Sequence, residues 1–259
     1  MGVHTFEAMG TTVSVRVVEA ADAPAARARL DDAFAGVRDV FDAFERTFSL
    51  YRHDSELSRI ARGELRLDDA SREMRDAYAE AVGWRARTRG AFTPHRPDGV
   101  VDLSGLVKAE AIAAAGDVLR SVGFGAFSVN AGGDVLTAGA ARRGHWTTGV
   151  IDPADRSHLL TAVRSDADLP AAATSGRSER GEHIWSTPAH AEAPPGDAIA
   201  QATVLAGDIV TADVLATAIV AGGRATLDAV TEEHPVGVLV VFGDGTLAAN
   251  PRCRERIVR

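Results

Sequence analysis

Cysteine is almost absent from this chain of 259 residues, in which Cys253 is the single example. One cysteine cannot form an intrachain disulfide, and it cannot supply a cysteine-based metal cluster. Its simplest interpretation is an inert thiol in the last strand or the tail. Both disulfide frameworks and cysteine-ligated metal centres are therefore excluded.

Positive charge is also in short supply, because 28 lysines and arginines face 36 acidic residues and the net charge is −8. This balance argues against a nucleic-acid partner and against a polybasic membrane patch. No apolar run reaches the ~18 residues of a spanning helix, and the first residues contain neither a signal-peptide core nor a lipidation cysteine. We expect a cytoplasmic protein without a membrane segment, although an exported protein trimmed of its leader would read the same.

What is present is the composition of a globular protein, with 46% hydrophobic and 25% charged residues. Alternating valines predict a strand at 11–18, and apolar residues at spacings of three and four predict a long helix from about 24 that buries Leu30 to Phe44. Further helices are predicted at 71–87, with Val82 inward, at 106–122 and at 211–223. Strands are predicted at 126–139, 146–151, 158–165 and 202–208, with a loop at 186–200 and a closing hairpin around Asp244-Gly245. Because helices and strands come in clusters, we predict a single α+β domain covering residues 1–259.

Three segments could carry chemistry. In the first, Asp102 and Ser104 lie where a helix begins, so free backbone amides and Lys108 could face an anion together. An ordinary capped amphipathic helix explains the same residues. The second is the turn Asn130 to Asp134, whose consecutive glycines permit close backbone approach but also suit a plain hairpin.

The third segment is the helix that starts near Thr211, a good N-cap residue. Asp213 and Thr217 lie four residues apart and therefore share one helix face. Their oxygens are hard donors suited to Mg²⁺ and poorly suited to zinc. A more common explanation for the two residues is structural: Asp213 caps the helix, and the Thr217 hydroxyl bonds to the backbone of its own helix.

Several enzyme classes find no support. The glycine spacings match neither a dinucleotide-binding fingerprint nor a P-loop, and no serine elbow or paired zinc histidines occur. His183 is a candidate for acid–base work near neutral pH. It is one of eight histidines, so composition alone does not select it.

Eight short segments form a pattern along the chain: Met9 to Thr11, Ser49 to Leu57, Gly90 to Thr93, Asp102 to Ala109, Asn130 to Asp134, Trp146 to Val150, Ser175-Gly176, and Ala212 to Ala218. Taken in order, these segments resemble the ApbE family of FAD:protein FMN transferases over nearly the whole chain. Each matching segment is short, and seven or eight of them in register make the resemblance specific.

The resemblance implies a two-lobed α+β fold with mixed or antiparallel sheets, flanking helices and FAD between the lobes. FAD is then the substrate, and Mg²⁺ would be held by Asp213, Thr217 and the backbone carbonyl of Gly105. A threonine of an acceptor flavoprotein would attack the FMN-side phosphorus, AMP would leave, and His183 would be the catalytic base. The implied FAD contacts are Met9, Tyr51, Ala91, Phe92, Thr93, Asp102, Lys108, Ile184 and Trp185.

This chain departs from the family pattern after His183 and Ile184, where Trp185 to Pro188 replace the expected acidic residue and Thr-Gly. The segment between Phe92 and Asp102 is also shorter than in the family. Two other functions therefore stay open: a Mg²⁺-dependent FAD pyrophosphatase, in which water replaces the acceptor hydroxyl, and a non-catalytic FAD-binding paralogue.

Overall fold

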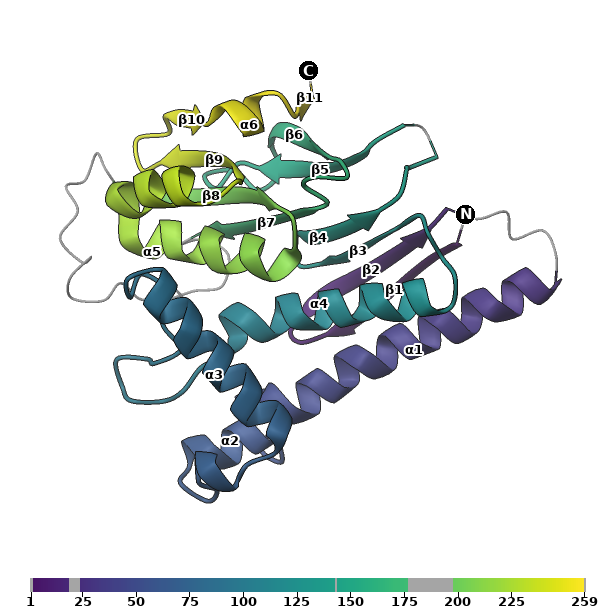
Figure 1. The fold of residues 1–259 in the computed structure, drawn as a ribbon, viewed down its shortest axis with the longest axis vertical. Coiled ribbons are helices and arrows are strands. Elements are labelled where there is room, and N and C mark those ends of the chain that lie inside the picture. Colours follow the sequence, from purple (N-terminus) through teal and green to yellow (C-terminus); the bar gives the residue numbers. More distant parts are fainter. Residues whose placement is uncertain (1, 19–23, 143, 177–197, 259) are drawn as a thin grey trace. The chain divides into compact units, whose positions relative to one another are not determined.

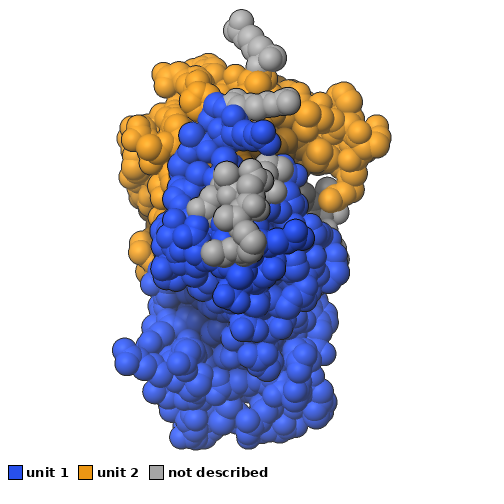
Figure 2. Space-filling view, turned by 90° about the vertical axis from the view of Figure 1, so that its right-hand side faces the viewer, with its two compact units in different colours: residues 1–81, 94–144 blue, residues 82–93, 145–259 orange. Residues whose placement is uncertain are grey.

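The computed structural model describes the chain except for residues 1, 19–23, 143, 177–197 and 259. It divides into two compact units, coloured separately in Figure 2. Unit 1 comprises residues 1–81 and 94–144, and unit 2 comprises residues 82–93 and 145–259. Each unit has its own antiparallel strands and its own helices (Figure 1).

Unit 1 contains four antiparallel strands in the order β1–β2–β3–β4. The alternation of valines explains β2, because Val13, Val15 and Val17 all point to one face and are buried. A glycine turn closes the hairpin of β3 and β4, as the sequence predicts. The bounds are Gly2–Ala8 for β1, Thr11–Val17 for β2, Phe127–Ala131 for β3 and Asp134–Ala138 for β4.

Helices α1 and α4 lie side by side and pack on these strands (Figure 1). The apolar stripe of α1 is buried from Leu30 to Phe41, whereas Phe44, also predicted to be buried, is only half-buried. Phe41 is fully enclosed, which contributes about 2 kcal/mol of hydrophobic stabilisation. Gly123, with a φ of 91°, follows α4 and ends it in the left-handed region, a conformation that favours glycine at this position. The helices are α1 (Pro24–Phe48), α2 (Glu56–Ala61), α3 (Arg72–Arg87, which runs on into unit 2) and α4 (Ser104–Ser121), with a 3₁₀ turn at Leu67–Asp69.

Unit 2 contains two antiparallel groups of strands, β7–β8–β9–β10 and β11–β6–β5. A cluster that includes Val163, Leu205, Leu239 and Cys253 forms part of its core. The strands are β5 (Trp146–Ile151), β6 (Leu159–Ser165), β7 (Ala171–Gly176), β8 (Ile199–Ala206), β9 (Gly237–Phe242), β10 (Leu247–Ala249) and β11 (Ile257–Val258), and the short helix α6 is Pro251–Arg254.

Helix α5 (Ile209–Glu233) packs on β7 and β8 and is broken at Gly223, whose φ of 67° and ψ of −153° are not helical. By length and composition alone it could cross a membrane, which corrects the expectation that no segment could. However, 67% of its apolar window is buried inside the protein. The apolar character of α5 is explained by its place in the core of unit 2.

Two local predictions are wrong. Asp208, and not Thr211, caps α5, because the Asp208 carboxylate accepts hydrogen bonds from the Thr211 amide and hydroxyl, both at 2.7 Å. Val82 of α3 is exposed, because the buried stripe of this helix runs through Met74, Ala81 and Trp84 and leaves Val82 beside it. The predicted loop at 186–200 lies mostly outside the described residues, and its last two residues already belong to β8.

Candidate functional site

The start of α4 in unit 1 is fixed by Asp102. Its Oδ1 accepts a hydrogen bond of 2.9 Å from the Ser104 amide, and its own amide donates to the Pro94 carbonyl at 2.8 Å. The side chain is buried, so the carboxylate is held in one orientation. Asp102 precedes Leu103, the N-cap residue of α4, and its carboxylate satisfies the amide of Ser104, the first helical residue.

Lys108 lies one turn further along α4 and forms an ion pair with Asp134, the first residue of β4. The turn before Asp134 is shaped by Asn130, whose Oδ1 accepts a hydrogen bond of 3.0 Å from the Gly133 amide. Two segments that the sequence analysis treated separately are thus one structural feature. The glycine turn presents Asp134, and Asp134 holds the amine of Lys108.

Met9 and Gly10 form the two-residue turn between β1 and β2, with φ angles of 50° and 70°. Positive φ at both positions is the pattern of a type I′ hairpin turn. The Met9 amide donates to the carboxylate of Glu45 on α1 at 3.2 Å. Glu45 therefore ties this turn to α1, an anchor that the sequence pattern did not indicate.

Tyr51 projects into solvent, with 86% of its surface exposed. The residues around it are structural: the Ser49 carbonyl accepts hydrogen bonds from the hydroxyls of Ser55 and Ser58, and Ser55 caps α2. Glu56 binds the amide and hydroxyl of Ser71, each at 2.6 Å. This part of the family-like pattern builds a scaffold, and it leaves the Tyr51 ring available for a ligand.

In unit 2, Ala91 and Phe92 are buried and Thr93 is half-buried just after α3. Thr88 sets this segment, because its hydroxyl donates to the Trp84 carbonyl at 2.8 Å and accepts from the Phe92 amide at 3.0 Å. On α5, Gly222 lies against Ala91 so closely that an added Cβ would stand 2.9 Å from the Ala91 Cβ. The Ala91–Thr93 segment is therefore held on two sides.

Asp213 and Thr217 lie one turn apart on α5, as predicted. Asp213 is 2% exposed, and the Thr217 hydroxyl oxygen is 3.0 Å from the hydroxyl oxygen of Ser175 on β7. Among the described residues, no group of three or more histidines, cysteines and acids could hold a metal ion. A carboxylate and a hydroxyl beside it nevertheless fit a hard cation such as Mg²⁺, which takes few protein ligands and keeps the rest of its shell for water or phosphate.

The remaining predicted site residues fall into two groups. Gly105 belongs to unit 1 whereas Asp213 and Thr217 belong to unit 2, so the three-donor cation site stays a prediction. His183, Ile184 and Trp185 lie outside the described residues. Ser175 was not predicted as an individual site residue, because a serine after three alanines and a threonine carries no sign of its partner.

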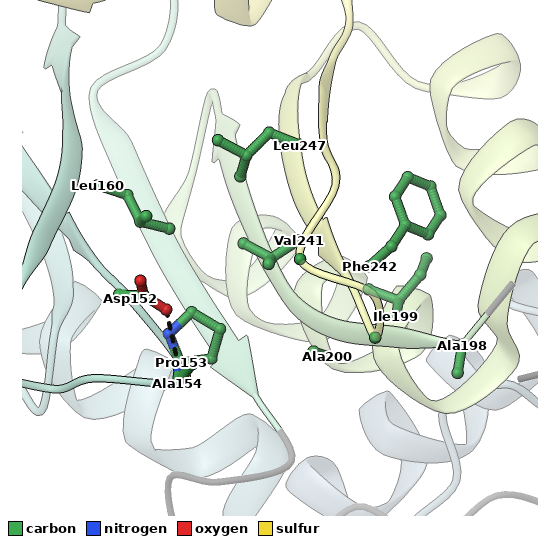
Figure 3. Close-up of a pocket in the computed structure, with 12 residues that line it drawn as sticks. Asp152, Pro153, Ala154, Leu160, Ala198, Ile199, Ala200, Val241, Phe242 and Leu247 are labelled. Atoms are coloured by element: carbon green, nitrogen blue, oxygen red, sulfur yellow. Dashed lines mark hydrogen bonds between the residues drawn. The ribbon is translucent and has the colours of Figure 1, made fainter. Parts of the chain in front are cut away.

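Unit 2 also contains an open apolar cavity of about 380 Å³. Leu160, Val241 and Leu247 point into it, and Asp152 lies at its edge (Figure 3). Of the predicted site residues that the structure describes, none lines this cavity.

A model of the ApbE family matches the chain over residues 9–97 and 94–242. Three solved structures are similar to this chain. Flavin transferase ApbE from Vibrio cholerae has a TM-score of 0.73 and 22% sequence identity, with 98% of each chain covered. The ApbE protein from Thermotoga maritima and flavinyl transferase ApbE from Pseudomonas stutzeri each have a TM-score of 0.77 and 18% identity; the match covers 100% of this chain and 99% of the Thermotoga chain, and 99% of this chain and 98% of the Pseudomonas chain. A sequence search among curated proteins gives no significant match. The structural likeness establishes the fold and confirms the predicted α+β class, and the family model spans most of the sequence. This chain belongs to the ApbE family.

Proposed function

We propose that this protein transfers FMN from FAD to a threonine hydroxyl of an acceptor protein, with Mg²⁺ and with release of AMP. The observation that carries the proposal is the family match over residues 9–242, because solved proteins of this fold are named flavin transferases. The hard-donor pair Asp213 and Thr217 on α5 supports the cation.

In the proposed reaction each predicted residue has its own task. Asp213 and Thr217 would hold the cation, with the Gly105 carbonyl as the predicted third ligand, and a bound Mg²⁺ would neutralise charge on the pyrophosphate. Lys108, held by Asp134, adds a positive charge for the phosphates. Tyr51 and Met9 contact the flavin nucleotide, with Ala91, Phe92 and Thr93 beside it. Asp102 also lines the site, through its fixed carboxylate at the start of α4.

The chemical step forms one bond and breaks one. The acceptor hydroxyl oxygen bonds to the FMN-side phosphorus, and the bond from that phosphorus to the bridging oxygen breaks, so AMP leaves with that oxygen. The hydroxyl proton passes to a base, for which we propose His183, with Ile184 and Trp185 next to the FAD. Removing a general base of this kind lowers rates by roughly 10²–10⁴-fold.

The proposal is tested by incubating the protein with FAD, Mg²⁺ and an acceptor domain that carries a threonine, and by measuring the mass of the acceptor by mass spectrometry. An increase in the acceptor mass equal to one FMN supports the transferase. Free FMN and AMP with an unmodified acceptor would show the pyrophosphatase, and bound but unchanged FAD would show a binding protein. The last outcome is the one favoured by the altered residues after His183.

Two variants and one control variant locate the chemistry within this test. Asp213→Ala should abolish cation-dependent transfer in a folded protein, whereas Thr203→Val, which removes a buried hydroxyl elsewhere in unit 2, should keep it. His183→Ala should bind FAD normally and lose turnover. Transfer at the wild-type rate by Asp213→Ala, or transfer that resists EDTA, would remove the cation from the mechanism.

A further inference from the structure

Ser175 and Thr217 connect β7 to α5 through their hydroxyl groups, whose oxygens are 3.0 Å apart. Ser175 is 8% exposed, so water has little access to its side chain. Among the described residues, each of these two hydroxyls has the other as its one side-chain hydrogen-bond partner. The pair is therefore a dedicated contact between a strand and the helix that carries Asp213.

Which of the two hydroxyls donates the hydrogen bond depends on the other contacts of the Thr217 hydroxyl. A helical threonine commonly donates its proton to the carbonyl four residues back, which here is that of Asp213. In the described structure Thr217 makes no such bond and faces Ser175 instead. If Thr217 gives a lone pair to a cation, its proton needs an acceptor on the other side, and the Ser175 oxygen stands at hydrogen-bond distance.

We propose that Ser175 is a positioning residue for the cation site: its oxygen accepts the Thr217 proton and so turns a Thr217 lone pair toward the cation that Asp213 also binds. This inference rests on the proposed function. Groups that orient metal ligands in this way typically change metal affinity by about 10- to 100-fold when they are removed.

A second hydroxyl pair in the same strands provides a matched comparison. Thr174 of β7 and Thr203 of β8 have their hydroxyl oxygens 2.9 Å apart, and Thr203 is fully buried. Thr174 precedes Ser175 and so points to the opposite face of the strand. Thr203→Val removes a buried hydroxyl that also pairs with a hydroxyl of a neighbouring element, and Thr203 has no part in the proposed cation site.

The experiment titrates Mn²⁺, which accepts the same oxygen ligands as Mg²⁺, into the FAD-saturated protein without acceptor. Free aquo-Mn²⁺ is followed by electron paramagnetic resonance. Ser175→Ala should weaken Mn²⁺ binding about 10-fold, and Thr203→Val should leave it unchanged. In a Thr217→Val background, Ser175→Ala should not change the Mn²⁺ affinity further, because a residue that acts through the Thr217 hydroxyl has no effect once that hydroxyl is removed.

Each other result overturns the inference in a distinct way. Unchanged Mn²⁺ affinity in Ser175→Ala, with binding lost in Asp213→Ala, removes the positioning role and leaves the proposed function standing. Equal weakening in Ser175→Ala and Thr203→Val means that general loosening of unit 2 is responsible. If the wild-type protein binds Mn²⁺ no better than Asp213→Ala, the cation site and the positioning residue fail together.

Discussion

Lys108 of α4 and Asp134 of β4 form an ion pair that is almost removed from solvent, with 13% of the lysine side chain and none of the aspartate side chain exposed. The two residues stand 26 positions apart, and the pair ties the first turns of α4 to the glycine turn that precedes β4. Lys108 is also the chain's only lysine, so its chemistry can be followed without interference from other side-chain amines.

Lys108→Met should lower the free energy of unfolding by about 3 kcal/mol, because it removes the counter-charge of a buried carboxylate. Asp76→Asn is the matched control, since it breaks an exposed pair with Arg72 and should cost less than about 1 kcal/mol. Urea unfolding measures both. Equal stability of the two variants would mean that burial of the Lys108–Asp134 pair has no energetic consequence.

FAD should protect Lys108 from acylation. Under the proposed function the amine contacts FAD, so saturating FAD should slow its reaction with an acylating reagent at least several-fold. The N-terminal α-amine of the same chain is the internal control and should react at an unchanged rate. Peptide mass spectrometry reports both sites, and equal labelling of Lys108 with and without FAD would contradict its placement in the FAD site.

The Cys253 thiol should be inert and should make stability depend on alkaline pH. Burial raises its pKa from the ordinary 9.0 to about 11, although nearby Arg256 partly offsets this. Because the folded state holds the proton more tightly than the unfolded chain, this stabilisation is complete below about pH 9 and is lost as the pH rises toward about 11.

Unfolding midpoints measured between pH 8 and pH 11 test this, with Cys253→Ala as the control for other groups that titrate there. The variant should lose less stability than the wild type over that interval. A thiol-reactive disulfide should label Cys253 only after denaturation. Rapid labelling of the native protein at pH 8 would show that the thiol is not enclosed by the core of unit 2.

Much of the fold could be predicted from periodicity alone. The alternation in β2 and the apolar stripe of α1 are strong sequence signals, because apolar and polar residues follow the period of a strand or of a helix. Strand β7 went unpredicted because Ala171 to Gly176 are all small and offer no such contrast, and the contacts that bury them come from β8 and α5. Helix α5 was predicted only as far as Gly223, where its backbone does break.

The candidate site was less accessible to sequence reasoning. Residue types and helix spacing placed Asp213 and Thr217 on one face of α5, but tertiary packing alone brings Ser175 to Thr217 and Asp134 to Lys108. The sequence also could not distinguish roles within a motif. Ser55 and Glu56 secure α2, whereas Tyr51 nearby is left exposed.

The last prediction concerns Gly222, which lies beside the break in α5. An added Cβ there would stand 2.1 Å from the Thr226 hydroxyl and 2.9 Å from the Ala91 Cβ, closer than real side chains approach. Gly222→Ala must therefore displace the Ala91 segment or the helix, at a cost of about 1–3 kcal/mol. Since Ala91 is a proposed FAD contact, the variant should also bind FAD more weakly.

Gly83 on α3 is the matched control, because a Cβ there meets only an arginine nitrogen of Arg87 at 3.6 Å, an ordinary contact. Gly83→Ala should raise stability by up to about 1 kcal/mol, the usual difference between alanine and glycine in a helix. It should leave FAD affinity unchanged. Thermal unfolding and fluorescence titration of FAD measure both variants. If Gly222→Ala lowers the unfolding midpoint but keeps the wild-type FAD dissociation constant, the predicted coupling between Gly222 and FAD binding through the Ala91 segment is wrong.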